Sequence, residues 1–199
     1  MRLFAFRAPG SEADQPPGGV PDPRSCAELL PDGMARLPDG SVVAATTLRP
    51  APAVARPGKI ICIGLNYRAH VSEGAGREVP AWPLLFSKFS NAVIGDGEAI
   101  VRPEGTRALD LEVELGVVVG RRARRVAAAD ALAHVAGYVV VNDVSARDWQ
   151  GNKVALGEGQ KGDGQWTRAK GSDTFLPMGP VFVTADELDP AAGLRLRSW

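Results

Sequence analysis

The sequence of 199 residues is short of several features, and each shortage excludes a class of protein. Its only two cysteines, Cys26 and Cys62, form no C-x-x-C pair, which excludes a disulfide framework and a cysteine-based zinc site. They favour a reducing, cytoplasmic setting. No apolar run approaches the roughly 20 residues that span a bilayer, and the N-terminus lacks the apolar core of a secretory signal. We therefore expect no membrane partner.

An excess of charge of either sign is also missing. Lys and Arg total 23, as do Asp and Glu, so the formal net charge is zero. A nucleic-acid-binding protein would carry a basic excess on at least one face. The arginine-rich run 121–125 lies between an expected strand and an expected helix, so we interpret it as a solvated turn and expect no nucleic-acid partner.

Glycine and proline, in contrast, are abundant, with 23 and 16 residues. They are densest in residues 1–57, which we interpret as a small N-terminal lobe with short strands at 3–6 and 41–45, followed by a linker. The alternative is a partly disordered leader. Residues 58–199 are predicted to form a second, catalytic domain.

Within that domain, hydrophobic patterning predicts a mainly β structure. The predicted strands cover 59–65, 83–89, 110–120, 137–144 and 177–184. The alanine-rich segment 126–137 favours a helix, residues 66–74 favour a short helix or an ordered loop, and the glycine-rich segment 151–165 is predicted to be a long surface loop.

The strand predicted at 110–120 carries the first candidate site. Alternation places Asp110, Glu112 and Glu114 on one face, and side chains two apart on a strand are roughly 7 Å apart. Two glutamates at that spacing suit a hard divalent cation such as Mg²⁺. The alternative is a solvated acidic face. Against it, the strand continues as an apolar run typical of a central strand, where unneutralised carboxylates are costly.

Asp143 offers a third carboxylate, at the point where an apolar strand gives way to a turn. Loops leaving strand ends commonly carry sites, although a turn-forming or capping role is as good an explanation of Asp143 alone. Three carboxylates exceed the charge of one divalent ion, so cations are expected nearby. Lys170, Arg147 and Lys88 are available.

His70 is a candidate general base, because it follows a predicted buried strand and has Glu73 three residues later. On a helix those positions are neighbours, and a histidine oriented by a carboxylate suits proton transfer near neutral pH. A surface histidine beside a chance glutamate is the alternative. His134, in the alanine-rich segment, is interpreted as an ordinary helix residue.

Five segments in series, 58–73, 88–100, 110–120, 137–150 and 163–184, together resemble the fumarylacetoacetate hydrolase family, in particular its acylpyruvate hydrolase-like members. The resemblance covers about residues 56–184. It implies a mixed β-sandwich roll of the family's C-terminal domain type, mainly β with some α, in a homodimer that binds Mg²⁺ or Mn²⁺. It also implies a small-molecule 2-oxo or 2,4-dioxo acid as substrate.

The resemblance also assigns residues. It implies that Glu112, Glu114 and Asp143 are the metal ligands and that His70, Glu73 and Lys170 are catalytic. Arg147 and Gln150 match positions that face the substrate in relatives.

We therefore expect a divalent-metal-dependent hydrolase that cleaves a C–C bond in 2,4-dioxo acids. The alternatives are an isomerase or decarboxylase of aromatic meta-cleavage intermediates, and a non-catalytic metal-binding remnant. The chain departs from the family in a long stretch between Gln150 and Trp166, in Ser172, and in stopping at Trp199 before a Thr/Gly-rich pocket segment. This last departure is interpreted as a C-terminal truncation.

Overall fold

The computed structural model describes residues 1–7, 25–73, 78–151 and 164–198, and within these ranges most of the regular structure is β-strand. The strands are β1 (Arg2–Ala5), β2 (Cys26–Leu29), β3 (Met34–Arg36), β4 (Val42–Ala44), β5 (Ile60–Gly64), β6 (Leu84–Lys88), β7 (Val93–Ile94), β8 (Leu109–Asp110), β9 (Val113–Val119), β10 (Val135–Asn142), β11 (Ser145–Ala146), β12 (Leu176–Pro177) and β13 (Val181–Thr184). The helices are α1 (Arg68–Glu73), α2 (Arg147–Gln150) and α4 (Trp166–Lys170), and the 3-10 helices are η2 (Ala45–Thr47), η3 (Ser90–Ala92), η4 (Ala128–His134) and η5 (Pro190–Ala192). The prediction of a mainly β chain with some α is confirmed.

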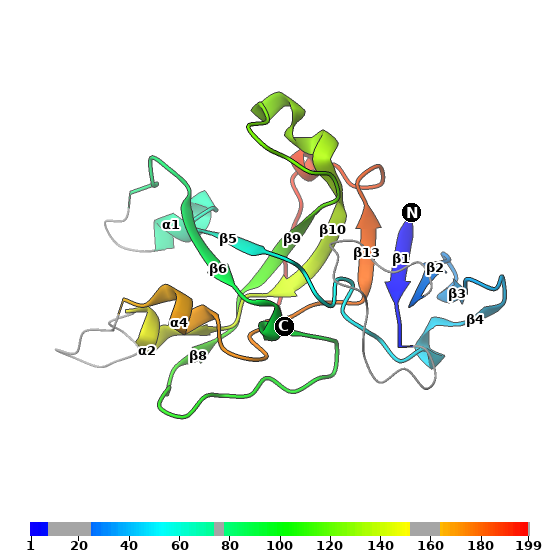
Figure 1. Ribbon diagram of the computed structural model, residues 1–199, viewed down its shortest axis with the longest axis horizontal. Helices are drawn as coiled ribbons and strands as arrows, with labels where there is room; N and C mark the ends of the chain where they lie inside the picture. Colours follow the sequence, from blue (N-terminus) through cyan, green and yellow to red (C-terminus); the bar gives the residue numbers. More distant parts are fainter. Residues whose placement is uncertain (8–24, 74–77, 152–163, 199) are drawn as a thin grey trace.

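The strands form one large sheet and three small ones. The large sheet has the order β4-β3-β2-β1-β13-β10-β9, and its pairs are antiparallel. Strands β5 and β6 form a separate antiparallel ribbon, β8 pairs with β11, and β7 runs parallel to β12. Figure 1 shows β2–β4 at one end of the molecule and the β5–β6 ribbon with the three α-helices at the other.

The N-terminal segment joins the large sheet through a distant part of the chain. Strand β1 pairs with β13, with Leu3 opposite Phe182, and the N–H of Ala5 donates to the carbonyl of Pro180 at 2.8 Å. The strand predicted at 3–6 is thus found at Arg2–Ala5, and the one at 41–45 at Val42–Ala44. The division into domains at residue 57 stays a prediction.

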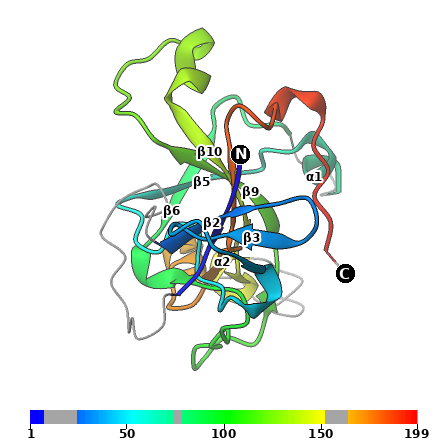
Figure 2. The ribbon, with the colours of Figure 1, turned by 90° about the vertical axis from the view of Figure 1, so that its right-hand side faces the viewer.

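Three predicted elements differ from the structure. The strand predicted at 177–184 is divided into β12, which pairs with β7, and β13, which pairs with β1 and β10. The segment 126–137 does not form an α-helix, because a 3-10 helix ends at His134 and Val135 already pairs with Val119 in the β9–β10 hairpin. This hairpin and η4 extend beyond the sheet in Figure 2. The strand predicted at 110–120 is broken after Asp110, because β8 and β9 pair with different strands. The loop predicted at 151–165 lies mostly outside the described residues.

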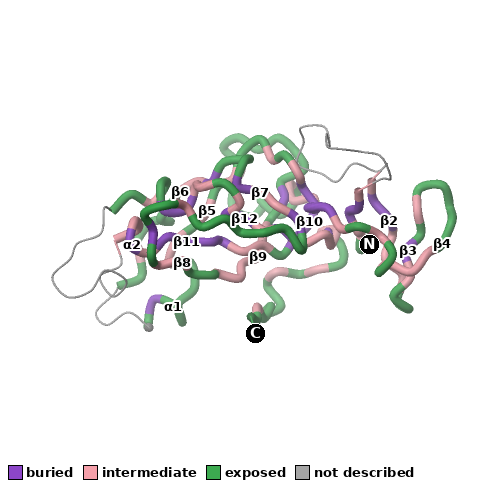
Figure 3. The backbone as a smooth tube through the Cα atoms, turned by 90° about the horizontal axis from the view of Figure 1, so that it is seen from below, coloured by how far each residue is buried: buried purple, intermediate pink, exposed green. Residues whose placement is uncertain are grey.

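Apolar burial is divided between two main clusters. One lies on the large sheet around Val118, Val139, Met178 and Phe182. The other, which includes Val144 and Phe175, is formed by residues of β11, β12 and η3 and of the segments beside them. Buried stretches run along the middle of the molecule from β2 past β10 to α2 in Figure 3. The second cluster supports the segments that carry the predicted site residues.

Candidate active site

Backbone hydrogen bonds bring two of the three predicted metal ligands together. The N–H of Asp143, directly after β10, donates to the carbonyl of Glu112 at 2.8 Å, and the N–H of Glu112 donates to the side chain of Asn142 at 3.1 Å. These bonds hold the break between β8 and β9 against the end of β10. The strand break therefore places Glu112 beside Asp143.

Lys170 lies between these two carboxylates. Its Nζ is 2.5 Å from Glu112 Oε2 and 2.8 Å from Asp143 Oδ2, and its side chain is only 2% exposed. Lys170 is the last residue of α4, a helix that packs on the β5–β6 ribbon through an edge contact between Trp166 and Phe86. The Lys170 ammonium also lies 5.0 Å from the Phe86 ring centre.

The residue that follows helix α4, Gly171, has to be small for a steric reason. A Cβ at this position would lie 2.6 Å from the carbonyl of Thr167 and 3.2 Å from the ring of Phe89. A larger residue would have to displace the helix end, and the Lys170 ammonium with it. The glycine that follows the lysine therefore belongs to the local architecture of the site.

Arg147 connects Glu112 to Gln150, the other residue that is predicted to face the substrate. Its guanidinium pairs with Glu112, donates to Asp110 Oδ2 at 2.8 Å and donates to Gln150 Oε1 at 2.7 Å. The N–H of Arg147 also donates to the carbonyl of Ala108, which anchors the start of α2 beside β8. Arg147 and Gln150, predicted from the resemblance, thus meet side by side, and Asp110 pairs with Arg147.

Glu114 lies within the electrostatic reach of this cluster. Burial raises its pKa, a hydrogen bond shared with Tyr67 lowers it, and the charges of Glu112 and Asp143 raise it further. Tyr67 precedes α1, so this hydrogen bond connects α1 to the carboxylates. Tyr67 was missed from the sequence, although its place directly before the His70 helix was a usable signal.

His70 is an exposed residue of α1. The side chain of Glu73 is outside the described residues. Helix α1 begins directly after Tyr67, whose hydrogen bond with Glu114 places the start of this helix beside the carboxylates. The catalytic role of His70 and Glu73 stays a prediction.

Lys88 is a second lysine of the site that the sequence offered only as an available cation. Its side chain is fully buried, and its Nζ lies 2.8 Å from Asp143 Oδ1. Burial lowers the pKa of Lys88, and the neighbouring Asp143 opposes that effect. Its signal in the sequence was its position two residues after Phe86, on the inward face of the strand.

We tested whether these residues suit a divalent cation. Within the described part of the chain, no three His, Cys, Asp or Glu side chains are gathered closely enough to hold a metal ion. The donors are nevertheless carboxylate oxygens, which hard cations prefer. Asp143 Oδ1 is buried and receives no hydrogen bond, and burial disfavours the charged form of Glu114. An additional positive charge would therefore stabilise both carboxylates, and the residues present fit a divalent cation.

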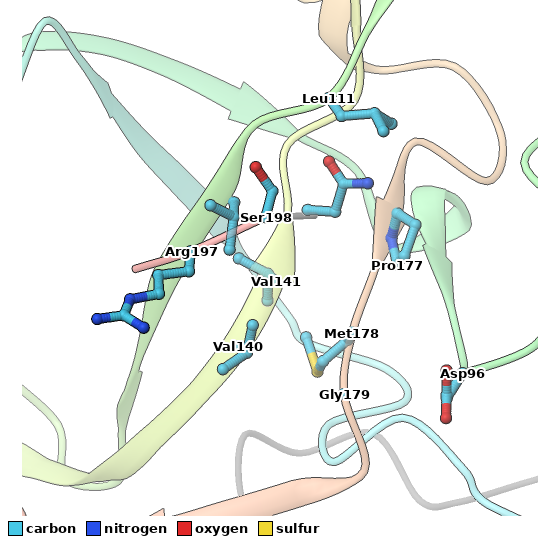
Figure 4. A pocket seen from close by; sticks show the side chains of 11 residues that line it. Asp96, Leu111, Val140, Val141, Pro177, Met178, Gly179, Arg197 and Ser198 are labelled. Atoms are coloured by element: carbon cyan, nitrogen blue, oxygen red, sulfur yellow. The ribbon is translucent and has the colours of Figure 1, made fainter. Parts of the chain in front are cut away.

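A shallow hollow of about 250 Å³ lies elsewhere on the sheet, between β10 and the segment around β12 (Figure 4). Val140, Met178, Arg197 and Ser198 line it. Glu112, Glu114, Asp143 and the two lysines are not among its lining residues. Because it is mostly apolar and the site's carboxylates and lysines do not line it, we do not place the substrate there.

Comparison with known proteins identifies the fold. The family model "Fumarylacetoacetate (FAA) hydrolase C-terminal" matches residues 59–199. The chain is 38% identical over 219 residues to the mitochondrial oxaloacetate tautomerase FAHD2A of Bos taurus, and 36% identical to that of Homo sapiens. Each alignment covers 98% of this chain and 67% of the relative.

Solved structures agree. A 5-carboxymethyl-2-hydroxymuconate delta-isomerase from Mycobacterium smegmatis has a TM-score of 0.71 at 33% identity, covering 96% of this chain and 68% of that one. A 2-hydroxyhepta-2,4-diene-1,7-dioate isomerase from Mycobacterium marinum gives 0.69 at 32% identity, with the same coverage. No helix among the described residues is long and apolar enough to cross a membrane. The chain belongs to the fumarylacetoacetate hydrolase family, with the family's C-terminal domain fold.

Proposed function

We propose that this chain carries divalent-metal-dependent enolate chemistry on a small 2-oxo acid, with proton transfer, as in tautomerisation or isomerisation, as the reaction. The observation that carries the proposal is the buried arrangement of Lys170 between Glu112 and Asp143, with Arg147 and Gln150 beside it. The relatives named as an oxaloacetate tautomerase and as dienedioate isomerases support it.

The charges of the site suit this chemistry. Four carboxylates (Asp110, Glu112, Glu114 and Asp143) surround three cationic side chains (Lys88, Lys170 and Arg147), a formal balance of −1. A divalent ion held by Glu112, Glu114 and Asp143 would change that balance to +1. A dianionic 2-oxo acid would then be attracted to the site, and its enolate would be stabilised by the same charge.

Each residue of the site would have a separate role in this reaction. Arg147 and Gln150 would bind and orient the substrate carboxylate, since a guanidinium suits carboxylate recognition. Lys170 would oppose the negative charge that develops on the 2-oxo oxygen. His70, with Glu73, would take the proton from the carbon next to the 2-oxo group, and that proton would be returned to the enolate oxygen or to another carbon. No water is consumed in this reaction.

Hydrolytic cleavage of a 2,4-dioxo acid is the second candidate. It is favoured by the family match over residues 59–199. In that reaction His70 would activate water instead of taking a proton from the substrate. Mg²⁺ or Mn²⁺, a cytoplasmic location and a homodimer remain part of the proposal. The mammalian relatives, by contrast, are named as mitochondrial.

The test compares oxaloacetate and an acylpyruvate as substrates, each with Mn²⁺ and with a chelator. We expect Mn²⁺-dependent loss of the oxaloacetate enol absorbance, and at least a tenfold decrease in Glu114→Gln but not in the exposed control Glu28→Gln. Cleavage of acylpyruvate without oxaloacetate tautomerisation would establish the hydrolase instead. Equal activity in Glu114→Gln and the parent would remove Glu114 from the site.

A further inference from the structure

Lys88 has an unusual set of contacts that the reaction itself does not require. Its Nζ donates to the carbonyls of Val144 at 3.0 Å, Lys170 at 2.5 Å and Phe175 at 2.8 Å. An ammonium has three N–H donors, so these bonds use all of them. The three carbonyls belong to the residue after Asp143, to the end of α4 and to the segment before β12.

The same ammonium lies 2.8 Å from Asp143 Oδ1, yet that oxygen receives no hydrogen bond. The three carbonyls match the three N–H donors of Lys88, which leaves Oδ1 with the ion pair alone. Lys88 therefore gives Asp143 the charge of a neighbouring cation without occupying the lone pairs of Oδ1. Lys170, in contrast, donates a proton directly to Asp143 Oδ2 and to Glu112 Oε2.

We propose that Lys88 is a positioning residue, which fixes the backbone on both sides of the site so that Asp143 Oδ1 stays available to a divalent cation and Lys170 stays aligned with Glu112. The metal part of this proposal rests on the proposed function. The two lysines then have opposite effects on a bound cation: Lys88 prepares its ligand, and Lys170 competes for the same carboxylate oxygens.

Matched substitutions separate these roles. Lys88→Met and Lys170→Met remove the same ammonium from similarly buried positions, and only the first removes the three carbonyl contacts. In calorimetric titration of the full chain with Mn²⁺, we expect the dissociation constant to rise at least tenfold in Lys88→Met. We expect it to stay equal or to fall in Lys170→Met, because a competing cation is lost.

A second measurement is independent of metal. Hydrogen exchange of the metal-free chain should accelerate at the amides of Asp143, Val144 and Gly171 in Lys88→Met and much less in Lys170→Met. If the parent binds no Mn²⁺, the proposed metal site fails, while this contrast still decides whether Lys88 orders the two segments.

Lys88→Arg covers the case in which Lys88→Met does not fold. A planar guanidinium keeps the charge but does not reproduce the tetrahedral donors, so we expect a folded chain with weakened Mn²⁺ binding. The proposal is overturned if Lys88→Met or Lys88→Arg binds Mn²⁺ as tightly as the parent. It is also overturned if the two methionine variants weaken binding alike, or if both Lys88 variants fail to fold, which would make Lys88 a residue of core stability alone.

Discussion

The two ends of the molecule handle charge in opposite ways. At the β2–β4 end, Arg36 pairs with Glu28 at 2.6 Å across neighbouring strands, and both side chains are more than 40% exposed. At the other end, Lys88, Lys170 and Asp143 are paired where their side chains are at most 9% exposed. Buried ion pairs are poor sources of net stability, because desolvation offsets their attraction. Net stability is therefore a weak explanation of the buried pairs, whereas the chemistry proposed for the site gives them a role.

The largest expected effect follows from removing the anion of the buried cluster. Asp143→Ala would leave the two buried ammoniums without their shared partner, which typically costs about 3–5 kcal/mol of unfolding free energy. Urea unfolding of the metal-free chain measures this loss. Asp110→Ala is the control, because its side chain is half exposed and should change stability by less than about 1 kcal/mol. Equal losses in both variants would contradict the comparison.

A smaller effect is expected at Asp148, a buried carboxylate of α2 that accepts hydrogen bonds from Thr106 Oγ1 at 2.6 Å and from the N–H of Arg107 at 2.9 Å. Burial raises the pKa of Asp148, and its hydrogen bonds lower that pKa by more, so the net shift is downward. Asp148→Ala should cost about 1–3 kcal/mol at neutral pH.

The sign of the pH dependence follows from that lowered pKa. The charged form is favoured in the folded state, so its stabilisation is complete above the ordinary carboxyl pKa of about 3.9 and is lost as the pH falls through the lower folded value. In thermal unfolding of the parent and of Asp148→Asn, the difference in Tm should be constant above about pH 5 and shrink in stronger acid. A difference that grows in acid would reverse this assignment.

At the exposed end, breaking the Arg36–Glu28 pair should change little. Each of Arg36→Met and Glu28→Gln is expected to alter the unfolding free energy by less than about 1 kcal/mol, because exposed pairs gain little in water. A double-mutant cycle in urea measures their coupling. A coupling as large as the loss in Asp143→Ala would show that the two ends do not differ.

The smallest effect is expected at Cys62, whose thiol lies within the electrostatic influence of the buried cluster. The quantity measured there is the reactivity of the thiol. Burial raises the pKa of Cys62 to about 11, with a further contribution from the charge of Asp143. Against an ordinary thiol pKa of 9.0, the thiolate fraction at neutral pH falls by roughly a hundredfold. In a Cys26→Ser background, alkylation by iodoacetamide should be slower than that of a free cysteine peptide by about this factor. Alkylation at the peptide's rate would place Cys62 in water.

Local patterns predicted several elements closely, since β5, β6 and α1 lie within the predicted segments 59–65, 83–89 and 66–74. They failed where distant pairing decides the structure. The alanine content of 126–137 favoured a helix, but pairing of Val135 with Val119 begins a strand there. This pairing depends on the register between two strands, and amino-acid composition carries no information about that register.

The candidate site shows the same limit. Strand alternation pointed to Glu112 and Glu114, and the strand end pointed to Asp143. The way these residues are held depends on contacts made far along the chain. Lys88 reaches carbonyls 56, 82 and 87 residues away. The spacing of residues in the sequence therefore did not predict the role of Lys88. Its position on the inward face of a predicted strand indicated only that this lysine was unusual.

The pairing of β1 with β13 has a consequence for how the chain acquires its structure. The amino group of Met1 donates to Thr184 across 183 residues, so β1 can pair early with β2 but meets its other neighbour, β13, only after residues 181–184 have been made. Contacts this distant in sequence slow folding, because the loop between them must close first. During synthesis, the partly folded chain presents the open edge of β1 to other chains, and strand edges of this kind promote aggregation. Slow translation before residue 184 would lengthen that exposure.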